Sequence, residues 1–306
     1  MRLLRTALAV GLAGGPVAHA GAQQRADSGY VFHVSEPAFP PGSGPVVLVD
    51  EAHGNFHTLG GRYAPFGAVL AADGFVVRPH RGPFEAGSLE GASVLVIANA
   101  LHEDNAENWA LPTPSAFPES EIAAVADWVA GGGALFLIAD HMPFPGAAAA
   151  LAAAFGVTFN NGFAVDPDDW SPLRFDRESG TLLDTPVTAG RKPSEAVDHV
   201  VSFTGQAFTV PGTAVPVLRL PAGFVTLTPE IAWQFDEETP REPVEGWSQG
   251  ALVRHGRGRV AIFGEAAMFT AQRADGRSTG LAHPGADQNA RFLLNILHWL
   301  AGPIGG

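Results

Sequence analysis

Short apolar runs recur along the chain and alternate with segments that have the composition of helices. The runs are continuous and rich in β-branched residues, which is typical of strands buried on both faces of a parallel sheet. The expected strands are residues 46–49, 75–77, 94–97, 135–138, 250–253 and 260–263, and the expected helices are 62–72, 118–130, 147–154 and 287–300. This alternation predicts an α/β fold with a mostly parallel sheet and helices on both faces.

The middle third of the chain has a different pattern. Residues 166–245 contain many prolines and short Val, Thr and Phe runs, which indicate strands and turns without helices. We interpret this stretch as a β-rich elaboration of the same domain. The parallel pattern is expected to resume at residue 250, with a hairpin turn at 256–259 before the last strand.

The first twenty residues have the pattern of a secretory signal peptide. Arg2 and Arg5 precede a short apolar run that ends in Ala18-His19-Ala20, where we expect cleavage. No later apolar run reaches the roughly 20 residues needed to span a bilayer, so no membrane span is expected. The sequence therefore predicts a periplasmic or secreted protein, with an N-terminal arm at 21–44 and a single domain at 45–302.

Composition narrows the chemistry. The chain has no cysteine, so thiol nucleophiles, disulfides and thiolate metal sites are all excluded, and only His, Asp and Glu remain as metal ligands. It carries 18 Lys and Arg against 31 Asp and Glu, a net charge of −13. An acidic protein of this kind is a poor partner for nucleic acid, so none is expected.

Acids, amides and histidines follow four of the expected strands. Because ligands bind beyond the carboxyl ends of the strands in an open α/β sheet, we expect these side chains to converge on one site. Polar residues that could bind a ligand are Asp50, Asn99, Arg62, Tyr63 and Asn289. Arg62 and Tyr63 begin the first helix, where a guanidinium suits an anion, although packing on the helix surface would use them equally well.

Histidines among these residues suggest a metal. His53, His102, Asp140 and His141 could hold one zinc, manganese or iron ion, with Glu265 or His57 as general base and His283 as a further catalytic residue. Each also has a structural reading, since loop histidines and strand-end acids often cap helices or brace loops. No Gly-x-Ser-x-Gly motif or metalloprotease helix signature is present.

Several stretches resemble the uncharacterised DUF4350 family and, more distantly, the class I glutamine amidotransferase-like superfamily. They are residues 47–50, 95–99, 132–140, 258–265 and 289–300, spread over most of 45–301. The resemblance implies a flavodoxin-like three-layer α/β sandwich. Amidotransferases of that superfamily use a cysteine nucleophile, and its expected position is occupied here by Asp140 and His141, so glutamine hydrolysis by that route is excluded.

Two functions remain compatible with the sequence. The first is an exported metal-assisted hydrolase with its site at the carboxyl ends of the parallel strands. The second is a non-catalytic periplasmic domain that binds a small molecule or carbohydrate in the same place, with loop tryptophans stacking on it. The tryptophans that fall in expected loops are Trp109, Trp170, Trp233 and Trp247.

Overall fold

The computed structural model describes residues 24–274, 276–302 and 304. Its main element is one large sheet. The strands are β2 (Val46–Asp50), β3 (Val76–His80), β4 (Val94–Ala98), β5 (Ala134–Ile138), β6 (Thr158–Phe159), β10 (Phe208–Thr209), β11 (Val215–Arg219), β14 (Ser248–His255) and β15 (Gly258–Phe263). They form a nine-stranded sheet in the order β3-β2-β4-β5-β15-β14-β10-β6, with β11 also paired to β14.

The sheet is mixed. Strands β3, β2, β4, β5 and β15 run parallel to their neighbours. Strand β14 pairs antiparallel with β15, and β10, β11 and β6 continue the antiparallel half. The expected hairpin at 256–259 therefore forms, but β14 does not extend the parallel pattern. The protein has a mixed α/β fold with a large mixed sheet.

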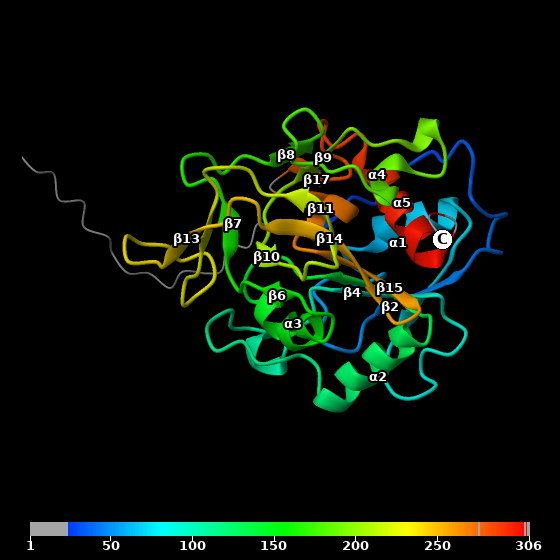
Figure 1. The fold of residues 1–306 in the computed structure, drawn as a ribbon, viewed down its shortest axis with the longest axis horizontal. Helices are drawn as coiled ribbons and strands as arrows, with labels where there is room; N and C mark the ends of the chain where they lie inside the picture. Colours follow the sequence, from blue (N-terminus) through cyan, green and yellow to red (C-terminus); the bar gives the residue numbers. More distant parts are fainter. Residues whose placement is uncertain (1–23, 275, 303, 305–306) are drawn as a thin grey trace, which may run out of the picture.

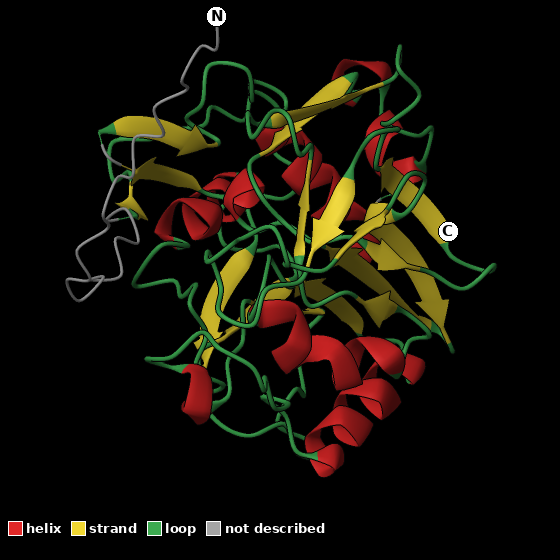
Figure 2. Ribbon diagram, turned by 90° about the vertical axis from the view of Figure 1, so that its left-hand side faces the viewer, coloured by secondary structure: helices red, strands yellow, loops and turns green. Residues whose placement is uncertain are grey.

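Helices cover both faces of the sheet. They are α1 (Ala64–Ala72), α2 (Glu119–Ala130), α3 (Phe144–Ala153) and α5 (Asn289–Ala301). Helices α1 and α5 share one buried cluster with Val96 and Phe136, while α2 and α3 share another with Leu95 and Leu135. Successive strand residues point to opposite faces, so each parallel strand contributes to both clusters. Figures 1 and 2 show these layers from two directions.

Besides contributing β10 and β11 to the large sheet, the middle third forms small antiparallel sheets. Strands β7 (Phe163–Val165), β12 (Val225–Leu227) and β13 (Arg241–Pro243) make one sheet, and β8 (Leu173–Asp176) and β9 (His199–Ser202) make another. The expectation of no helix here was wrong, because α4 (Pro186–Ala189) and a 3₁₀ turn, η2 (Pro193–Glu195), lie within it. Proline at the first position of each turn fits the helical backbone without needing a donor.

The described part of the N-terminal arm packs on the domain. Strand β1 (Arg25–Ala26) pairs with β16 (Ala271–Ala274), which in turn pairs with β17 (Arg277–Gly280). Farther along the arm, the ring of Phe39 lies 5.1 Å from that of Phe75. The predicted signal peptide lies outside the described residues. Among the residues that the structure describes, no helix is long and apolar enough to cross a membrane.

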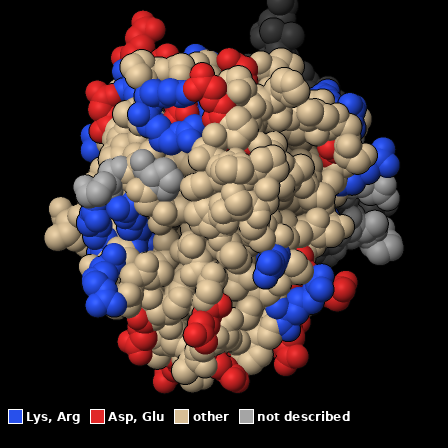
Figure 3. Space-filling view, turned by 90° about the vertical axis from the view of Figure 1, so that its right-hand side faces the viewer, with Lys and Arg blue, Asp and Glu red and all other residues tan. Residues whose placement is uncertain are grey.

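Charged side chains are interspersed on the face shown in Figure 3. Lysine and arginine form several separate groups there, with aspartate and glutamate between and around them. With a net charge of −13 for the whole chain, positive charge is the scarcer kind. A surface hollow that contains arginine and no acid is therefore notable in this protein.

Candidate functional site

Two acidic side chains lie buried together where the parallel strands β5 and β15 end. Asp140 is 8% exposed and Glu265 only 1%. Glu265 accepts hydrogen bonds from the backbone N–H groups of Ala267 at 2.8 Å and Met268 at 2.6 Å. Burial, followed by the charge of Asp140, raises the pKa of Glu265 well above its usual range. One carboxyl group of the pair therefore keeps its proton at neutral pH.

His141 follows Asp140 directly and has a fixed tautomer. Its Nδ1 lies 2.7 Å from the carbonyl oxygen of Met142, which can only accept, so Nδ1 carries the proton. The ring stacks on Phe163 at 4.6 Å and meets the edge of Trp233 at the same distance. Nε2 forms no hydrogen bond to any residue that the structure describes. In the neutral ring this nitrogen holds a lone pair and can act as a base.

Asn99 and Tyr63 fix the backbone around the carboxyl pair. The Oδ1 of Asn99 accepts from the N–H of Asp140 at 2.9 Å, and Asn99 itself adopts a φ of 52° at the end of β4. The hydroxyl of the fully buried Tyr63 donates to the carbonyl oxygen of Ala266 at 3.0 Å. Burial, with the charges of Glu265 and Asp140, raises the pKa of Tyr63 well above its usual value, so it remains a donor.

His57 is a neutral neighbour of this group. Its ring stacks on Tyr63 at 4.6 Å, and its buried Nδ1 has no hydrogen-bond partner among the described residues. Burial, aided by the charges of Arg62 and His141, lowers the pKa of His57 to about 3. An imidazole that resists protonation to this extent is a weak base. The predicted choice of His57 or Glu265 as general base is therefore not favoured, and His141 suits that role better.

His53 is held by carboxylates on both sides. Its Nδ1 lies 2.9 Å from both oxygens of Asp50, and its Nε2 lies 2.9 Å from Oε2 of Glu121. Burial opposes the charged ring, but the hydrogen bonds and charges of Asp50 and Glu121 outweigh it and raise the pKa of His53. Both ring nitrogens donate in this arrangement, so neither has a lone pair for a metal. Asp50, predicted to bind a ligand, is fully buried in the same cluster.

The predicted metal-ligand set is not assembled. His102 caps the 3₁₀ turn η1 (Glu103–Asn105) by accepting the N–H of Asp104 at its Nδ1. Across the described part of the chain, no group of three or more His, Asp or Glu side chains is placed to hold a metal ion. The described structure therefore does not bring together the four residues predicted to hold a zinc, manganese or iron ion. They are His53, His102, Asp140 and His141.

Two further predicted residues have structural partners. The Nδ1 of His283 accepts from the N–H of Gly285, and its ring meets the edge of Phe203 at 5.3 Å. Asn289 is fully buried at the start of α5, where its side chain bonds to both backbone groups of Val201 and to the carbonyl oxygen of Met268. Neither side chain joins the acidic pair, and that of Asn289 has no room for a ligand.

Two participants were missed from the sequence. Glu121 lies in the first turn of α2, and its carboxylate binds His53 and the N–H of Phe84. Trp233 was seen only as a loop aromatic, although its φ of 68° and its 48% exposure place an open indole beside His141. No sequence signal links either residue to its partner, because both contacts join distant segments.

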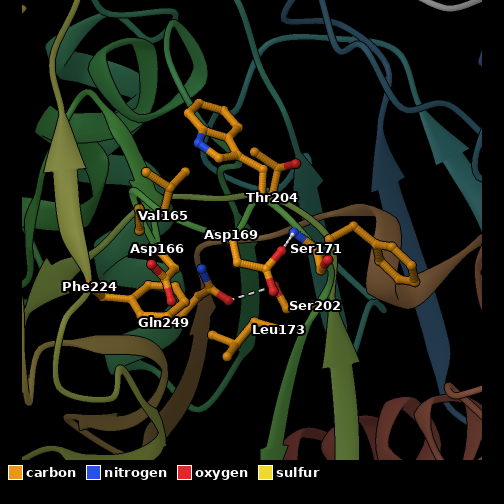
Figure 4. A pocket seen from close by; sticks show the side chains of 12 residues that line it. Val165, Asp166, Asp169, Ser171, Leu173, Ser202, Thr204, Phe224 and Gln249 are labelled. Carbon is orange, nitrogen blue, oxygen red and sulfur yellow. Dashed lines mark hydrogen bonds between the residues drawn. The ribbon is translucent and has the colours of Figure 1, made fainter.

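A small hollow lies in the β-rich third, as seen in Figure 4. Its volume is about 30 Å³, which roughly admits one or two water molecules. Ser202 donates to Gln249 at 2.6 Å within it, and Asp169 accepts the N–H of Ser171 at its rim. The hollow is too small for a sugar, although Trp170 at its edge is 46% exposed.

Comparison with known proteins gives the fold and nothing finer. No family model and no curated protein matches this sequence. Among solved structures, the mmIFT52 N-terminal domain superposes with a TM-score of 0.59 at 14% identity, over 83% of this chain and 97% of that one. The cytoplasmic protein STM1381 from Salmonella typhimurium LT2 gives 0.48 at 15% identity, over 83% and 98%. A ThuA-like protein from Bacteroides uniformis gives 0.46 at 12% identity, over 89% and 95%. At 14% identity, the superposition on the mmIFT52 N-terminal domain indicates a similarity of fold alone.

Proposed function

We propose that the protein is an exported hydrolase that works by acid–base chemistry at His141 and the carboxyl pair of Asp140 and Glu265. The observation that carries this proposal is the pair itself. Two carboxyl groups are buried together with raised pKa values, next to an imidazole with an open Nε2, and so provide a proton donor and a proton acceptor. Sites with pKa values displaced in this way are typical of catalytic centres.

The roles follow from access and protonation. Nε2 of His141 takes a proton from a water molecule, whose oxygen forms the new bond to the substrate. The bond to the leaving group breaks, and the protonated pair supplies a proton to it through Asp140, the more exposed of the two carboxyl groups. Tyr63 and Asn99 hold the backbone of this centre in place. No step in this scheme uses a metal.

The test is a hydrolysis screen with the purified full chain. Chromogenic carboxylic ester, anilide, phosphate ester and glycoside probes cover the main classes of bond. We expect turnover of at least one class. His141→Gln should lower kcat by about 10²-fold or more, because general base catalysis contributes that much. Asp140→Asn should have a similar effect.

His102→Gln is the matched control. This histidine caps a surface turn and is 31% exposed, so kcat should stay near that of the parent. Protein that hydrolyses none of the four classes would contradict the proposal. So would a His141→Gln variant with full activity and an unchanged circular dichroism spectrum.

A second candidate function, binding without catalysis, is favoured by Trp233. Its indole is half-exposed and lies at the edge of His141, where a sugar ring could stack. In this case the polar centre would hydrogen-bond a carbohydrate and leave it intact. A tryptophan fluorescence titration with oligosaccharides distinguishes the two, because binding that is lost in Trp233→Ala and is not followed by cleavage supports this candidate.

We also infer a flavodoxin-like sandwich for the domain, within the amidotransferase-like superfamily and its DUF4350 branch. The order β3-β2-β4-β5-β15 of the parallel strands supports this inference, since it corresponds to 2-1-3-4-5 in chain order. Export and cleavage after Ala20 remain part of the proposal. N-terminal sequencing of protein from an exporting host tests them, and an N-terminus at Gly21 is the expected result.

A further inference from the structure

A groove of about 600 Å³ opens beside the loop that follows β2. It is bounded by the described start of the N-terminal arm, by the turn before α1 and by the residues that follow β4. Its volume falls in the range of roughly 300–1,000 Å³ that small-molecule sites occupy. In chain order β2 and β4 are the first and third parallel strands, so the groove adjoins the point where the strand order reverses.

The lining of this groove is positively charged. It contains two arginines and no aspartate or glutamate, although acids outnumber basic residues 31 to 18 in the chain. The acids of η1 are near Ala106 in sequence but are not among the lining residues. Besides the arginines, the lining offers amide, hydroxyl and exposed backbone donors. The groups that the argument uses are Arg25, Arg62, Asn55, Thr58, Gly60 and Gly61.

Arg62 is held in a fixed position within the groove. Its Nε donates to the carbonyl oxygen of Gln24 at 3.1 Å and its Nη1 to that of Phe56 at 3.3 Å, while the guanidinium carbon lies 3.8 Å above the Phe56 ring. A guanidinium has five N–H donors, and no acceptor among the described residues takes the others. The side chain is thus oriented in advance and retains donors for a further partner.

The groove lies next to the proposed catalytic centre. Phe56 lines the groove, and its ring meets that of His57 at 5.4 Å. The Phe56 ring also meets that of Trp109 at 5.4 Å, and the Trp109 ring lies 6.1 Å from that of His141. Packed aromatic rings thus connect the groove with His141.

We propose that this groove binds a small molecule through an oxyanion group, a carboxylate, sulfate or phosphate, that is held by Arg62 and Arg25. Each of these groups presents a pair of oxygens that matches the forked donors of arginine, which can bind the pair with two parallel hydrogen bonds. The next step rests on the proposed function. The bound molecule is the substrate of the hydrolase, and its oxyanion group lies at the end that is not cleaved.

The test measures binding of inorganic phosphate to the full chain by calorimetry at low ionic strength. We expect saturable binding at one site. Arg62→Gln should weaken it at least tenfold and Arg25→Gln several-fold, while Arg62→Lys should retain part of it. Arg241→Gln is the control, because it removes an exposed positive charge from β13, outside the groove.

Three outcomes would overturn the proposal. They are an absence of phosphate binding, undiminished binding in Arg62→Gln, and equal weakening by Arg241→Gln, which would indicate unspecific attraction. Should Arg62→Gln fail to fold, Arg25→Gln decides, since its side chain is exposed. The assay involves no turnover. Phosphate binding in a protein that hydrolyses no probe would therefore support the groove and contradict the hydrolase.

Discussion

Oε2 of Glu121 lies 2.9 Å from Nε2 of His53, and this contact joins the first turn of α2 to the loop that follows β2. The opposite side of the ring is held by Asp50, so a charged imidazole lies between two carboxylates. Phe84 and Phe117 pack against the ring at 4.6 and 4.9 Å. The cluster is therefore a buried ionic brace for the carboxyl end of β2.

Removing the imidazole from this brace should strongly destabilise the fold. His53→Ala would leave the carboxylates of Asp50 and Glu121 buried without their counter-charge, which typically costs about 3–5 kcal/mol. Urea denaturation followed by circular dichroism measures this loss. His102→Ala, at a partly exposed position, should change the free energy of unfolding by no more than about 0.5 kcal/mol. Equal effects of the two substitutions would contradict the brace.

The brace should also weaken as the pH rises. The folded protein holds the proton of His53 more tightly than the unfolded chain does, because its folded pKa is raised. Its stabilising contribution is complete below about pH 6.5, the ordinary histidine value, and is lost as the pH passes through the raised folded value. Melting temperatures of the parent and of His53→Gln between pH 5 and 9 should therefore converge toward the alkaline end. A constant difference would show that His53 is not charged.

Glu265→Gln should stabilise the protein at neutral pH while abolishing the proposed activity. In the unfolded chain this carboxyl ionises near pH 4.3, whereas burial and Asp140 keep its proton in the folded state. Stability consequently falls as the pH rises from about 4.3 toward the raised folded pKa. The amide cannot ionise, so the variant escapes this loss. Thermal melts at pH 4 and pH 8 measure it, and a gain at pH 8 that is absent at pH 4 is the expected result.

Asn289→Ala should destabilise the packing of α5 without touching the proposed chemistry. The substitution leaves the backbone N–H and carbonyl of Val201 and the carbonyl of Met268 without their partner, at a cost of about 1–3 kcal/mol for each group that stays buried. Asn108→Ala, at an exposed position, is the control. If kcat on the active probe class falls in Asn289→Ala while the melting temperature is unchanged, Asn289 has a role in the site instead.

Local patterns were sufficient for the elements of the parallel half. Continuous apolar runs gave β2, β4, β5 and β15 to within about two residues, because such strands are buried on both faces. The apolar residues of β14 would suit either direction, and only the hairpin turn predicted at 256–259 indicated its orientation. The strand is antiparallel because the two-residue turn at Gly256 and Arg257 joins it directly to β15.

The residues of the site were harder to assign than its elements. The polar strand ends were visible in the sequence, but the side chains separate into distinct groups. His53 forms a hydrogen bond with Glu121 on α2. His141 forms one with the Met142 carbonyl and packs against the rings of Phe163 and Trp233. Which partner a histidine takes depends on rotamers and on contacts between distant segments, and neither is encoded by spacing along the chain. The spacing along the chain therefore suggested one shared site, whereas the structure places these histidines in separate groups.

Strands β5 and β15 are neighbours in the sheet, yet the whole β-rich third separates them in the chain. A nascent chain that has not yet reached residue 258 therefore lacks the partner for one side of β5. That strand is entirely apolar and presents an open row of backbone donors and acceptors until β15 arrives. Truncated or slowly completed chains should consequently aggregate through β5. A chaperone that binds the unfinished chain would need to cover this strand in particular.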